Sequence, residues 1–302
     1  MSAKFAIIPG TGWKAVEYDD AVRKTARHEN AKTRKTKDAE TKNTGGNMTS
    51  PIQAFGIDIG GSGIKGAPVD LEKGEFAQKR LRIPTPENAG PDEVAFTVKQ
   101  ILDEYEVEDG TPVGVAFPAP VKPGRKLSFM ANLAQSWVGT DVEAALSEKI
   151  GRRVHVINDA DAAGLAEAKY GAAKNCDGLV FVTTLGTGIG TAIIMNGVLV
   201  PNTELGHLIV KGKDAETLAS EAVRSREDLS WKKWGKRLTA YYQTVEHYFS
   251  PDLFVVGGGV SKKSEKFFPY IDIQTEIVPA DLLNTAGIVG AAYFAAEKQS
   301  AK

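Results

Sequence analysis

Cysteine is nearly absent from the sequence: Cys176 is the single cysteine among 302 residues. One thiol excludes an internal disulfide framework and any metal site built from a cluster of cysteines. Long apolar runs are also missing, since no uninterrupted hydrophobic stretch has the length that a membrane-spanning helix needs, and the N-terminus shows no signal-peptide pattern. We therefore expect a cytoplasmic protein with no membrane partner.

An excess of charge of one sign is absent as well, because the net charge is −1. This balance gives no global reason to expect a nucleic-acid partner. The charge is unevenly distributed, however, since residues 1–48 carry ten Lys and Arg against six Asp and Glu, with few large apolar residues. This composition predicts a disordered, basic N-terminal extension over residues 1–50. A nucleic-acid-binding arm is the alternative, but no interleaved aromatic residues support it.

Glycine is plentiful, and it occurs in strand–turn–strand patterns. Apolar residues at 55, 57 and 59 alternate with Gly56 and Asp58, which is typical of a strand, and the glycines that follow predict a tight turn into a second strand. Residues 61–67 and 186–192 share the pattern Gly-[Ser/Thr]-Gly-Ile-x-x-Ala. Two hairpins of one construction predict duplicated domains that grip a phosphate chain across a cleft. Coincidence between two glycine turns is the alternative.

Strand and helix patterns alternate along the rest of the chain, which predicts an α/β fold with a mixed sheet. Strands are expected at 76–83, 113–117, 154–157, 179–185 and 252–256, and helices at 91–106, 141–150, 160–170, 230–249, 261–268 and 282–298. The helix at 230–249 has an apolar stripe that we expect in the core: Trp231, Trp234, Leu238, Tyr241, Val245 and Tyr248. Its other face carries Lys232, Lys233, Lys236 and Arg237, either as a solvated surface or as a track for an anion.

Several residues lie where chemistry collects in α/β proteins. Asp159 follows a strand and opens a helix, so it is a helix N-cap, a base at the carboxyl end of the strand, or both. Asp58 lies beside the first glycine turn and is placed to meet a cation bound to phosphate. His207 is a candidate ligand-binding residue because Glu204 is near it in a polar loop, although an exposed histidine is the simpler interpretation. No Gly-x-Ser-x-Gly or Walker A pattern supports serine-nucleophile or P-loop chemistry.

Together these segments resemble the ROK sugar kinases of the hexokinase, Hsp70 and actin superfamily. The resemblance extends over about residues 52–297 and is carried by five motifs in order: Asp58-Ile59-Gly60-Gly61-Ser62, Asn158-Asp159, Leu185-Gly186-Thr187-Gly188-Ile189-Gly190, Glu204-Leu205-Gly206-His207 and Val256-Gly257-Gly258-Gly259-Val260. Within the family, the segments 58–67, 214–216 and 254–262 look most like the actinobacterial branch of polyphosphate glucokinases and glucomannokinases.

This resemblance implies a two-domain, actin-like (ribonuclease H-like) fold with a catalytic cleft between the domains. The small α/β domain would comprise residues 51–157 plus the C-terminal helix 287–298, and the larger one residues 158–286. It also implies a homodimeric kinase that phosphorylates the 6-hydroxyl of glucose from inorganic polyphosphate; whether ATP is also a donor and whether mannose is accepted stay open. The alternatives are an ATP-dependent ROK glucokinase or mannokinase, a sugar-responsive ROK repressor and an actin-like structural protein.

The resemblance also assigns roles to individual residues. Asp159 would be the base that accepts the proton of the sugar hydroxyl, and Asp58 would hold Mg²⁺. The sugar hydroxyls would be bound by Asn132, Asn158, Glu204, His207 and Glu216. The donor would be bound by Gly60, Gly61, Ser62, Gly63, Lys65, Gly186, Thr187, Gly188, Gly257, Gly258 and Gly259. Most ROK members complete a zinc site with cysteines after the Glu-x-Gly-His loop, and since this chain has none there, we expect no zinc.

Overall fold

The computed structural model describes residues 5–6, 14–15, 53–131 and 133–301. The chain divides into two units, Met1–Thr49 and Ser50–Lys302. In the first unit, β1 (Phe5–Ala6) pairs antiparallel with β2 (Lys14–Ala15). The rest of the predicted 1–50 extension lies outside the described residues, so its disorder stays a prediction.

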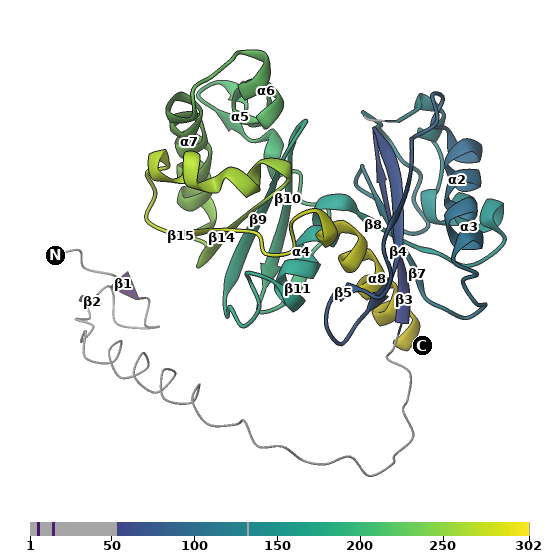
Figure 1. Cartoon of the computed structure of the whole chain (residues 1–302). Coiled ribbons are helices and arrows are strands. Elements are labelled where there is room, and N and C mark those ends of the chain that lie inside the picture. The colour runs from purple at the N-terminus through teal and green to yellow at the C-terminus, as the bar shows by residue number, and fades with distance from the viewer. Residues whose placement is uncertain (1–4, 7–13, 16–52, 132, 302) are drawn as a thin grey trace, which may run out of the picture. The chain divides into compact units, whose positions relative to one another are not determined.

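The second unit begins with a sheet in the order β5-β4-β3-β7-β8, with β6 also paired to β4. Its strands are β3 (Gln53–Gly60), β4 (Gly63–Asp70), β5 (Glu75–Phe76), β6 (Leu81–Ile83), β7 (Val113–Phe117) and β8 (His155–Asn158). The first hairpin is antiparallel, whereas β3, β7 and β8 run parallel. The helices α2 (Pro91–Glu104) and α3 (Val142–Ile150) cover one face (Figure 1). The Asp141 carboxylate caps α3 by accepting from Ala144 N at 3.2 Å.

The second sheet repeats this plan in the order β11-β10-β9-β14-β15. Its strands are β9 (Leu179–Leu185), β10 (Ile189–Met195), β11 (Val198–Val200), β14 (Leu253–Gly257) and β15 (Glu276–Pro279). Again the hairpin is antiparallel and the three strands β9, β14 and β15 run parallel. On this side of the molecule lie the small ladder of β12 (Ile209–Val210) and β13 (Lys213–Asp214) and the helices α5 (Ala215–Ala219), α6 (Glu221–Arg226) and α7 (Trp231–Phe249). The shared strand order is what a duplicated unit would produce.

Two helices join the sheets: α4 (Asp159–Tyr170) packs against β9 and β10, and α8 (Ala286–Ser300) against β3, β7 and β8. The two helices also pack against each other (Figure 1). Glycines make these contacts close. A Cβ at Gly56 would lie 2.0 Å from Ile288 O, and one at Gly114 would lie 1.8 Å from Ala291 O. A Cβ at Gly290 would lie 1.8 Å from Ala162 O, so no larger residue fits at the joint between the helices.

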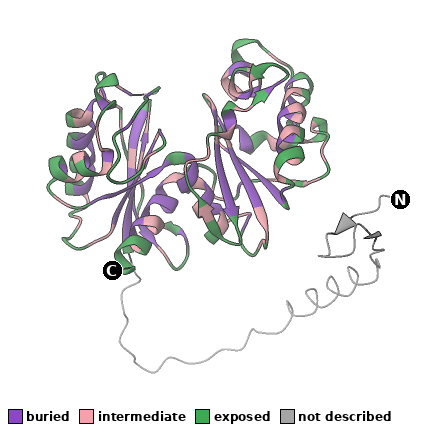
Figure 2. Ribbon diagram, turned by 180° about the vertical axis from the view of Figure 1, so that it is seen from behind, coloured by how far each residue is buried: buried purple, intermediate pink, exposed green. Residues whose placement is uncertain are grey.

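Each sheet has its own core, and the strands are buried while the outward faces of the helices are exposed (Figure 2). Trp137 anchors the first core, where its Nε1 donates to Ala89 O at 2.9 Å. Trp234 anchors the second, where its Nε1 donates to Ala219 O at 2.9 Å. Both indole rings are fully buried with their one polar group satisfied, which removes the main cost of burying tryptophan.

The strand predicted at 76–83 is wrong as a continuous element, because β5 and β6 are separated by residues 77–80. Both pair with β4, at Val69 and Gly66 respectively. Between these pairs β4 has Pro68, which has no N–H to donate, so the ladder is interrupted there. Ala77 N still donates to Pro68 O at 2.8 Å, whereas the residues after it leave the sheet, and Arg80 donates to Asn284 O at 3.2 Å.

Three helical predictions also need correction. The helix expected at 261–268 is the 3₁₀ helix η3 (Gly259–Lys266), which is interrupted by a non-helical Lys263. The helix expected at 282–298 begins at Ala286, after the 3₁₀ turn η5 (Leu283–Thr285). In α7, Tyr248 is 68% exposed because the last turn extends beyond the core, and Tyr242 is buried in its place. The remaining 3₁₀ helices are η1 (Gln135–Trp137), η2 (Leu205–His207) and η4 (Phe268–Tyr270).

Candidate active site

A cleft of about 330 Å³ lies between the two sheets. The first sheet contributes Asp58 and Lys65, the helix α4 contributes Asp159, and the second sheet contributes Thr184 and the Gly257–Gly258 turn. The start of α8 completes the wall at Ala286 and Gly287. The structure therefore brings the predicted base, the predicted metal ligand and part of the predicted donor site into one cleft.

Asp159 is the first residue of α4, and Asn158 is its N-cap. The Asn158 Oδ1 accepts from Ala160 N and Asp161 N, both at 3.0 Å, and its Nδ2 donates to Asp159 Oδ1 at 3.2 Å. The cap role considered for Asp159 thus belongs to its neighbour. Because Asn158 is buried and engaged in this way, it fixes the position of the Asp159 carboxylate at the carboxyl end of β8.

The Asp159 residue is exposed on the side that faces the cleft, and protein atoms displace water from its carboxyl group on the other sides. This loss of hydration raises the pKa of its carboxyl group to about 6, and the negative charges of Asp58 and Glu204 act in the same direction. The hydrogen bond from Ala160 N, at 2.8 Å, opposes the shift. At neutral pH the group is mostly ionised, and its pKa is in the range where a carboxylate can accept and release a proton.

Asp58 and Lys65 face each other across the first hairpin, with Lys65 Nζ donating to Asp58 Oδ2 at 2.7 Å. Both side chains are about three-quarters buried, and both line the cleft. The predicted metal ligand and the predicted donor-binding lysine are therefore direct partners. A metal-bound phosphate carries both charges: its oxygens would meet the ammonium group of Lys65, and its metal ion would meet the carboxylate of Asp58.

The tip of the first hairpin, residues 60–63, is held by two side chains from the neighbouring segment. Arg82 Nη2 donates to Ser62 O at 2.7 Å, and Thr85 Oγ1 donates to Gly60 O at 2.5 Å. Arg80 lines the cleft beside Lys65. We did not predict these arginines as site residues; the signal that could have indicated them is the alternation of Arg80 and Arg82 near the end of the predicted strand 76–83.

The tip of the second hairpin, residues 186–188, is held from the other side by Glu216. Its Oε2 accepts from Ile189 N at 3.0 Å, and a Cβ at Gly188 would lie 2.0 Å from the same oxygen. Gly186 O accepts from Ala222 N of α6 at 3.1 Å. Glu216, predicted to bind sugar, thus contacts the backbone of the predicted donor tip.

The loop with Glu204 and His207 lies beside β10. A Cβ at Gly206 would lie 1.9 Å from Ile189 O, which explains why glycine stands between them in the Glu-x-Gly-His motif. His207 Nδ1 lies 2.8 Å from Asp214 Oδ2, and this bond is the main cause of a raised pKa of the imidazole. Partial burial raises the pKa of Glu204, and the charge of Glu216 adds to it. Asp214, which we did not predict as a site residue, therefore orients His207 and keeps it cationic to higher pH.

A second connection crosses between the two sheets at Asn202. The Asn202 side chain accepts from Val121 N at 2.8 Å and donates to Val121 O at 3.1 Å. Its backbone N–H donates to Asp161 Oδ2 at 2.7 Å. Asp161 is buried, and burial raises the pKa of its carboxyl group to about 7. The loop after β7, the helix α4 and the loop that carries Glu204 are therefore tied to one another.

The remaining predicted site residues are the glycines after β14 and Asn132. Gly258 has φ of 83° and lies against Leu185, where a Cβ would be 2.3 Å from the Leu185 carbonyl oxygen, so the turn after β14 meets the base of the second tip. Gly259 begins η3. Asn132, the remaining predicted sugar ligand, lies outside the described residues, so its role stays a prediction.

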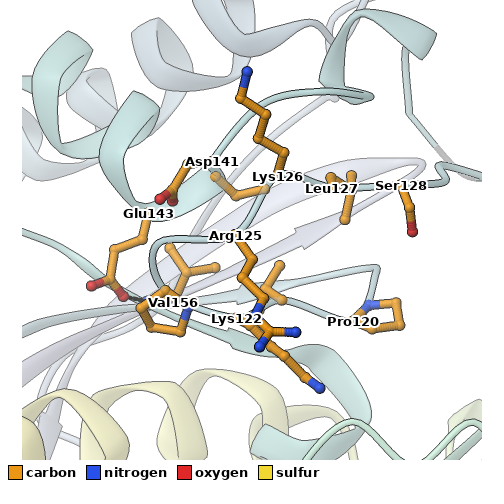
Figure 3. Close-up of a pocket in the computed structure, with 12 residues that line it drawn as sticks. Pro120, Lys122, Arg125, Lys126, Leu127, Ser128, Asp141, Glu143 and Val156 are labelled. Carbon is orange, nitrogen blue, oxygen red and sulfur yellow. Dashed lines mark hydrogen bonds between the residues drawn. The ribbon is translucent and has the colours of Figure 1, made fainter.

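A separate hollow of about 310 Å³ lies against the loop after β7 and the start of α3 (Figure 3). Its lining includes Lys122, Arg125 and Lys126 together with Asp141 and Glu143. In this view the Lys126 side chain points away from that of Arg125, and Glu143 is held by the N–H of Val156 at 2.9 Å. The three cations do not converge on one point.

Neither a metal cluster nor a membrane helix is found in the part of the chain that the structure describes. No three His, Cys, Asp or Glu side chains among those residues are grouped to hold a metal ion. None of the described helices has the length and apolarity to cross a bilayer.

Comparisons with known proteins agree with the motifs. The polyphosphate glucokinase of Mycobacterium tuberculosis is 46% identical over 254 residues, which cover 84% of this chain and 94% of that protein. The crystal structure of the inorganic polyphosphate/ATP-glucomannokinase from Arthrobacter is 50% identical, with a TM-score of 0.76 and coverage of 82% of this chain and 99% of that one. A glucokinase from Streptomyces griseus, crystallised with glucose and AMPPNP, is 22% identical with a TM-score of 0.68, covers 81% of this chain and 99% of that chain, and shows the same fold.

These structural neighbours confirm the predicted actin-like, two-domain fold. The model of the ROK family matches residues 54–220, more than half of the chain. Together with the identity to the Mycobacterium protein, this match shows that the chain belongs to the ROK family.

Proposed function

We propose that the chain transfers a phosphoryl group from inorganic polyphosphate, and from ATP, to the 6-hydroxyl of glucose. The names of the Mycobacterium and Arthrobacter relatives support this substrate pair. The structural observation that carries the proposal is the position of Asp159, at the floor of a cleft that also contains the paired Asp58 and Lys65. Phosphoryl transfer needs a base that lies between the residues that bind the sugar and the residues that bind the donor.

Asp159 accepts the proton of the sugar hydroxyl as the oxygen attacks the terminal phosphorus of the donor. The bond from that phosphorus to the next bridging oxygen breaks, and the shortened polyphosphate or ADP leaves. The transition state of phosphoryl transfer is loose, so correct positioning contributes more than the strength of the base. Asn158 supplies the positioning through its bond to Asp159 Oδ1 at 3.2 Å. With a pKa of about 6, the carboxylate is available at neutral pH.

The residues present fit a magnesium ion. Mg²⁺ prefers hard oxygen ligands and commonly uses one or two carboxylates together with substrate phosphates, rather than a cage built by the protein. Asp58 offers such a carboxylate in the cleft, close enough to Asp159 to raise its pKa, and Lys65 engages one of its oxygens, Oδ2. When bound, the ion would neutralise charge on the transferred phosphoryl group. Lys65 and the N–H groups of the two tips orient the rest of the donor.

In this proposal glucose is bound by Glu204, His207 and Glu216, with Asn132 and Asn158 as further ligands. Groups that accept and groups that donate are both needed, because each sugar hydroxyl does both. His207, whose raised pKa favours the protonated imidazole, donates, while Glu204 and Glu216 accept. Mannose is a second substrate by analogy with the Arthrobacter enzyme. A homodimer and a cytoplasmic location stay predictions from the family.

The decisive test is an assay for glucose 6-phosphate with polyphosphate or ATP as the only donor. We expect the wild-type protein to use both, and Asp159→Asn to lose at least about 10³-fold in kcat with either. Product from ATP alone would favour an ATP-dependent glucokinase or mannokinase. Sequence-specific DNA binding without kinase activity would favour a repressor, and an Asp159→Asn variant with nearly full activity would reject the proposed base.

The pKa of Asp159 gives a second test. Because the base acts in its ionised form, kcat/KM should rise with pH through a midpoint near the Asp159 pKa of about 6 and fall about tenfold for each pH unit below it. A pH profile of kcat/KM that is flat from pH 5 to 8 would contradict this role for the group.

A further inference from the structure

The cleft is too small to hold a polymeric donor. Its volume of about 330 Å³ is at the lower end of the range for small-molecule sites. If polyphosphate is the donor, as proposed above, most of the chain must continue over the surface beyond the transferred group. A polyanion on a protein surface requires clustered cations.

Cations are concentrated in two segments of the second lobe. Residues 211–237 and 259–268 together carry eleven Lys and Arg against six Asp and Glu, whereas the rest of residues 49–302 carries sixteen against twenty-six. This part of the surface is thus basic in a body that is otherwise acidic. The net charge of −1 for the whole chain does not reveal this difference between its basic and acidic parts.

Both segments are connected to the second hairpin near its tip. The helix α6 is joined to it because Ala222 N donates to Gly186 O at 3.1 Å. The turn that leads into η3 is joined to it because Gly258 packs against the backbone of Leu185 and lines the cleft. A phosphate chain that leaves the cleft past Gly186 therefore meets α6 and η3 first.

The two segments form one continuous surface around Trp231. The Arg224 guanidinium lies 4.3 Å from the centre of the Trp231 ring, and Lys266 Nζ lies 5.9 Å from it. Lys263 and Arg224 both lower the pKa of Glu221, so Lys263 also faces this point. The basic cap, as we name it, comprises Arg224 and the three exposed lysines of η3, Lys262, Lys263 and Lys266.

The lysines supply the free charge of the basic cap. Arg224 is paired with Glu221 at 2.9 Å, whereas Lys262, Lys263 and Lys266 are exposed. Three other cations, Arg125, Lys126 and Arg237, are less suitable. Arg125 and Lys126 point in different directions around a hollow that also contains Asp141 and Glu143 (Figure 3), and Arg237 is paired with Glu227 at 2.7 Å.

We propose that the basic cap binds the part of a polyphosphate chain that lies beyond the phosphoryl group being transferred. The contact would be electrostatic and without fixed register, since exposed lysines bind phosphates as point charges. It would increase the affinity for long chains and the rate at which they are captured, while leaving the chemical step unchanged.

The test compares the variant Lys262→Gln/Lys263→Gln/Lys266→Gln with the control Lys99→Gln/Lys174→Gln/Lys298→Gln, which removes three exposed lysines elsewhere. We expect the first variant to raise KM for long-chain polyphosphate about tenfold and to weaken its dependence on KCl concentration. KM for tripolyphosphate, ATP and glucose, and kcat with each donor, should stay unchanged. The control should behave like the wild type with every donor.

Two outcomes would overturn the basic cap: an unchanged KM for long chains, or an equal rise for long chains, tripolyphosphate and ATP. Direct binding of long-chain polyphosphate, measured by calorimetry without glucose, separates this proposal from the proposed function. If the wild type binds long chains without turning them over and the cap variant loses that binding, the cap stands and the donor assignment fails. If neither binds them, the cap is rejected.

Discussion

The two hairpins, β3–β4 and β9–β10, have the same backbone plan and different side chains. The pair Ile59–Ile64 in the first matches the pair Leu185–Ile189 in the second, since both pairs are opposed in the ladder and buried. Between them lie four residues (60–63) in the first hairpin and three (186–188) in the second. On the returning strands β4 and β10, the sequence repeat and the ladders match the same residues, Ile64 with Ile189. On the outgoing strands β3 and β9, the ladders match Ile59 with Leu185, which is one residue away from the alignment that the sequence repeat gives.

The alignment of the ladders makes Asp58 equivalent to Thr184, and Lys65 equivalent to Gly190, because each is the next opposed pair along. Asp58, Lys65 and Thr184 line the cleft. A Cβ at Gly190 would lie 2.4 Å from Thr184 Oγ1, so no side chain fits there. The first hairpin thus brings an ion pair to the cleft, whereas the second brings a neutral hydroxyl group.

Within this comparison we expect the largest effect on kcat/KM when Asp58 and Thr184, the two equivalent positions, are each substituted. Asp58→Asn removes the charge that would hold the metal, and we expect kcat/KM for glucose phosphorylation to fall about 10²–10³-fold. Thr184→Val keeps the shape and removes one neutral hydroxyl, so the expected loss is at most about tenfold. Initial rates over a range of Mg²⁺ concentrations measure both. Equal losses in the two variants would show that the hairpins contribute in the same way.

The second expected effect concerns α4, which joins the two hairpin sheets through Asp161 and Asn202. Burial raises the pKa of Asp161 to about 7, above its unfolded value, so the folded protein holds this proton more tightly than the unfolded chain. Stability from this group is present at low pH and is lost as pH rises toward 7. Asp161→Asn should therefore increase the free energy of unfolding at pH 8 by about 2–4 kcal/mol, with less change at pH 4.

Urea unfolding at pH 4 and pH 8 measures this difference. Asp103→Asn is the control, because Asp103 is exposed and paired only with Lys99 at 3.1 Å on the surface of α2. An Asp161→Asn protein whose stability changes with pH as steeply as the wild type would contradict the assignment.

A smaller effect tests how the second tip is held. Gly188→Ala places a methyl group against the Glu216 carboxylate, which must move away from Ile189 N. We expect KM for both donor and glucose to rise about fivefold to tenfold, since one hydrogen bond to a charged group is lost. Gly186→Ala is the matched control, because a Cβ there meets no atom within 4 Å. Similar kinetics for both variants would show that Glu216 does not hold the tip.

The sequence predicts most of the fold because its signals are local. Alternating apolar residues and glycine turns specify β3, β4, β9 and β10, and the Ser230 cap with an apolar stripe specifies α7. It failed at 76–83, where a single proline in the partner strand breaks the ladder. Local patterns cannot reveal that interruption, because it depends on which strand pairs with which.

The site is predicted less completely, for a physical reason. Motifs located Asp58, Asp159, Glu204 and His207, and the structure gathers the first two in the cleft. The supporting contacts join residues that are distant in sequence, such as Asn202 with Val121, 81 positions apart. Asp214 is near His207 in sequence, but their bond depends on the β12–β13 turn. Bonds of this kind follow from tertiary packing and have no periodic signal.

The smallest expected effect concerns Arg82, which holds the first tip as Glu216 holds the second. Its guanidinium donates to Ser62 O at 2.7 Å, and the side chain is exposed, so Arg82→Gln should raise KM for the donor only about threefold and leave kcat unchanged. Arg82→Lys distinguishes two causes. If the charge attracts the donor, lysine restores KM; if the planar fork positions the tip, it does not. Since a carboxylate holds the second tip, we expect positioning to dominate, and full rescue by lysine would reverse that conclusion.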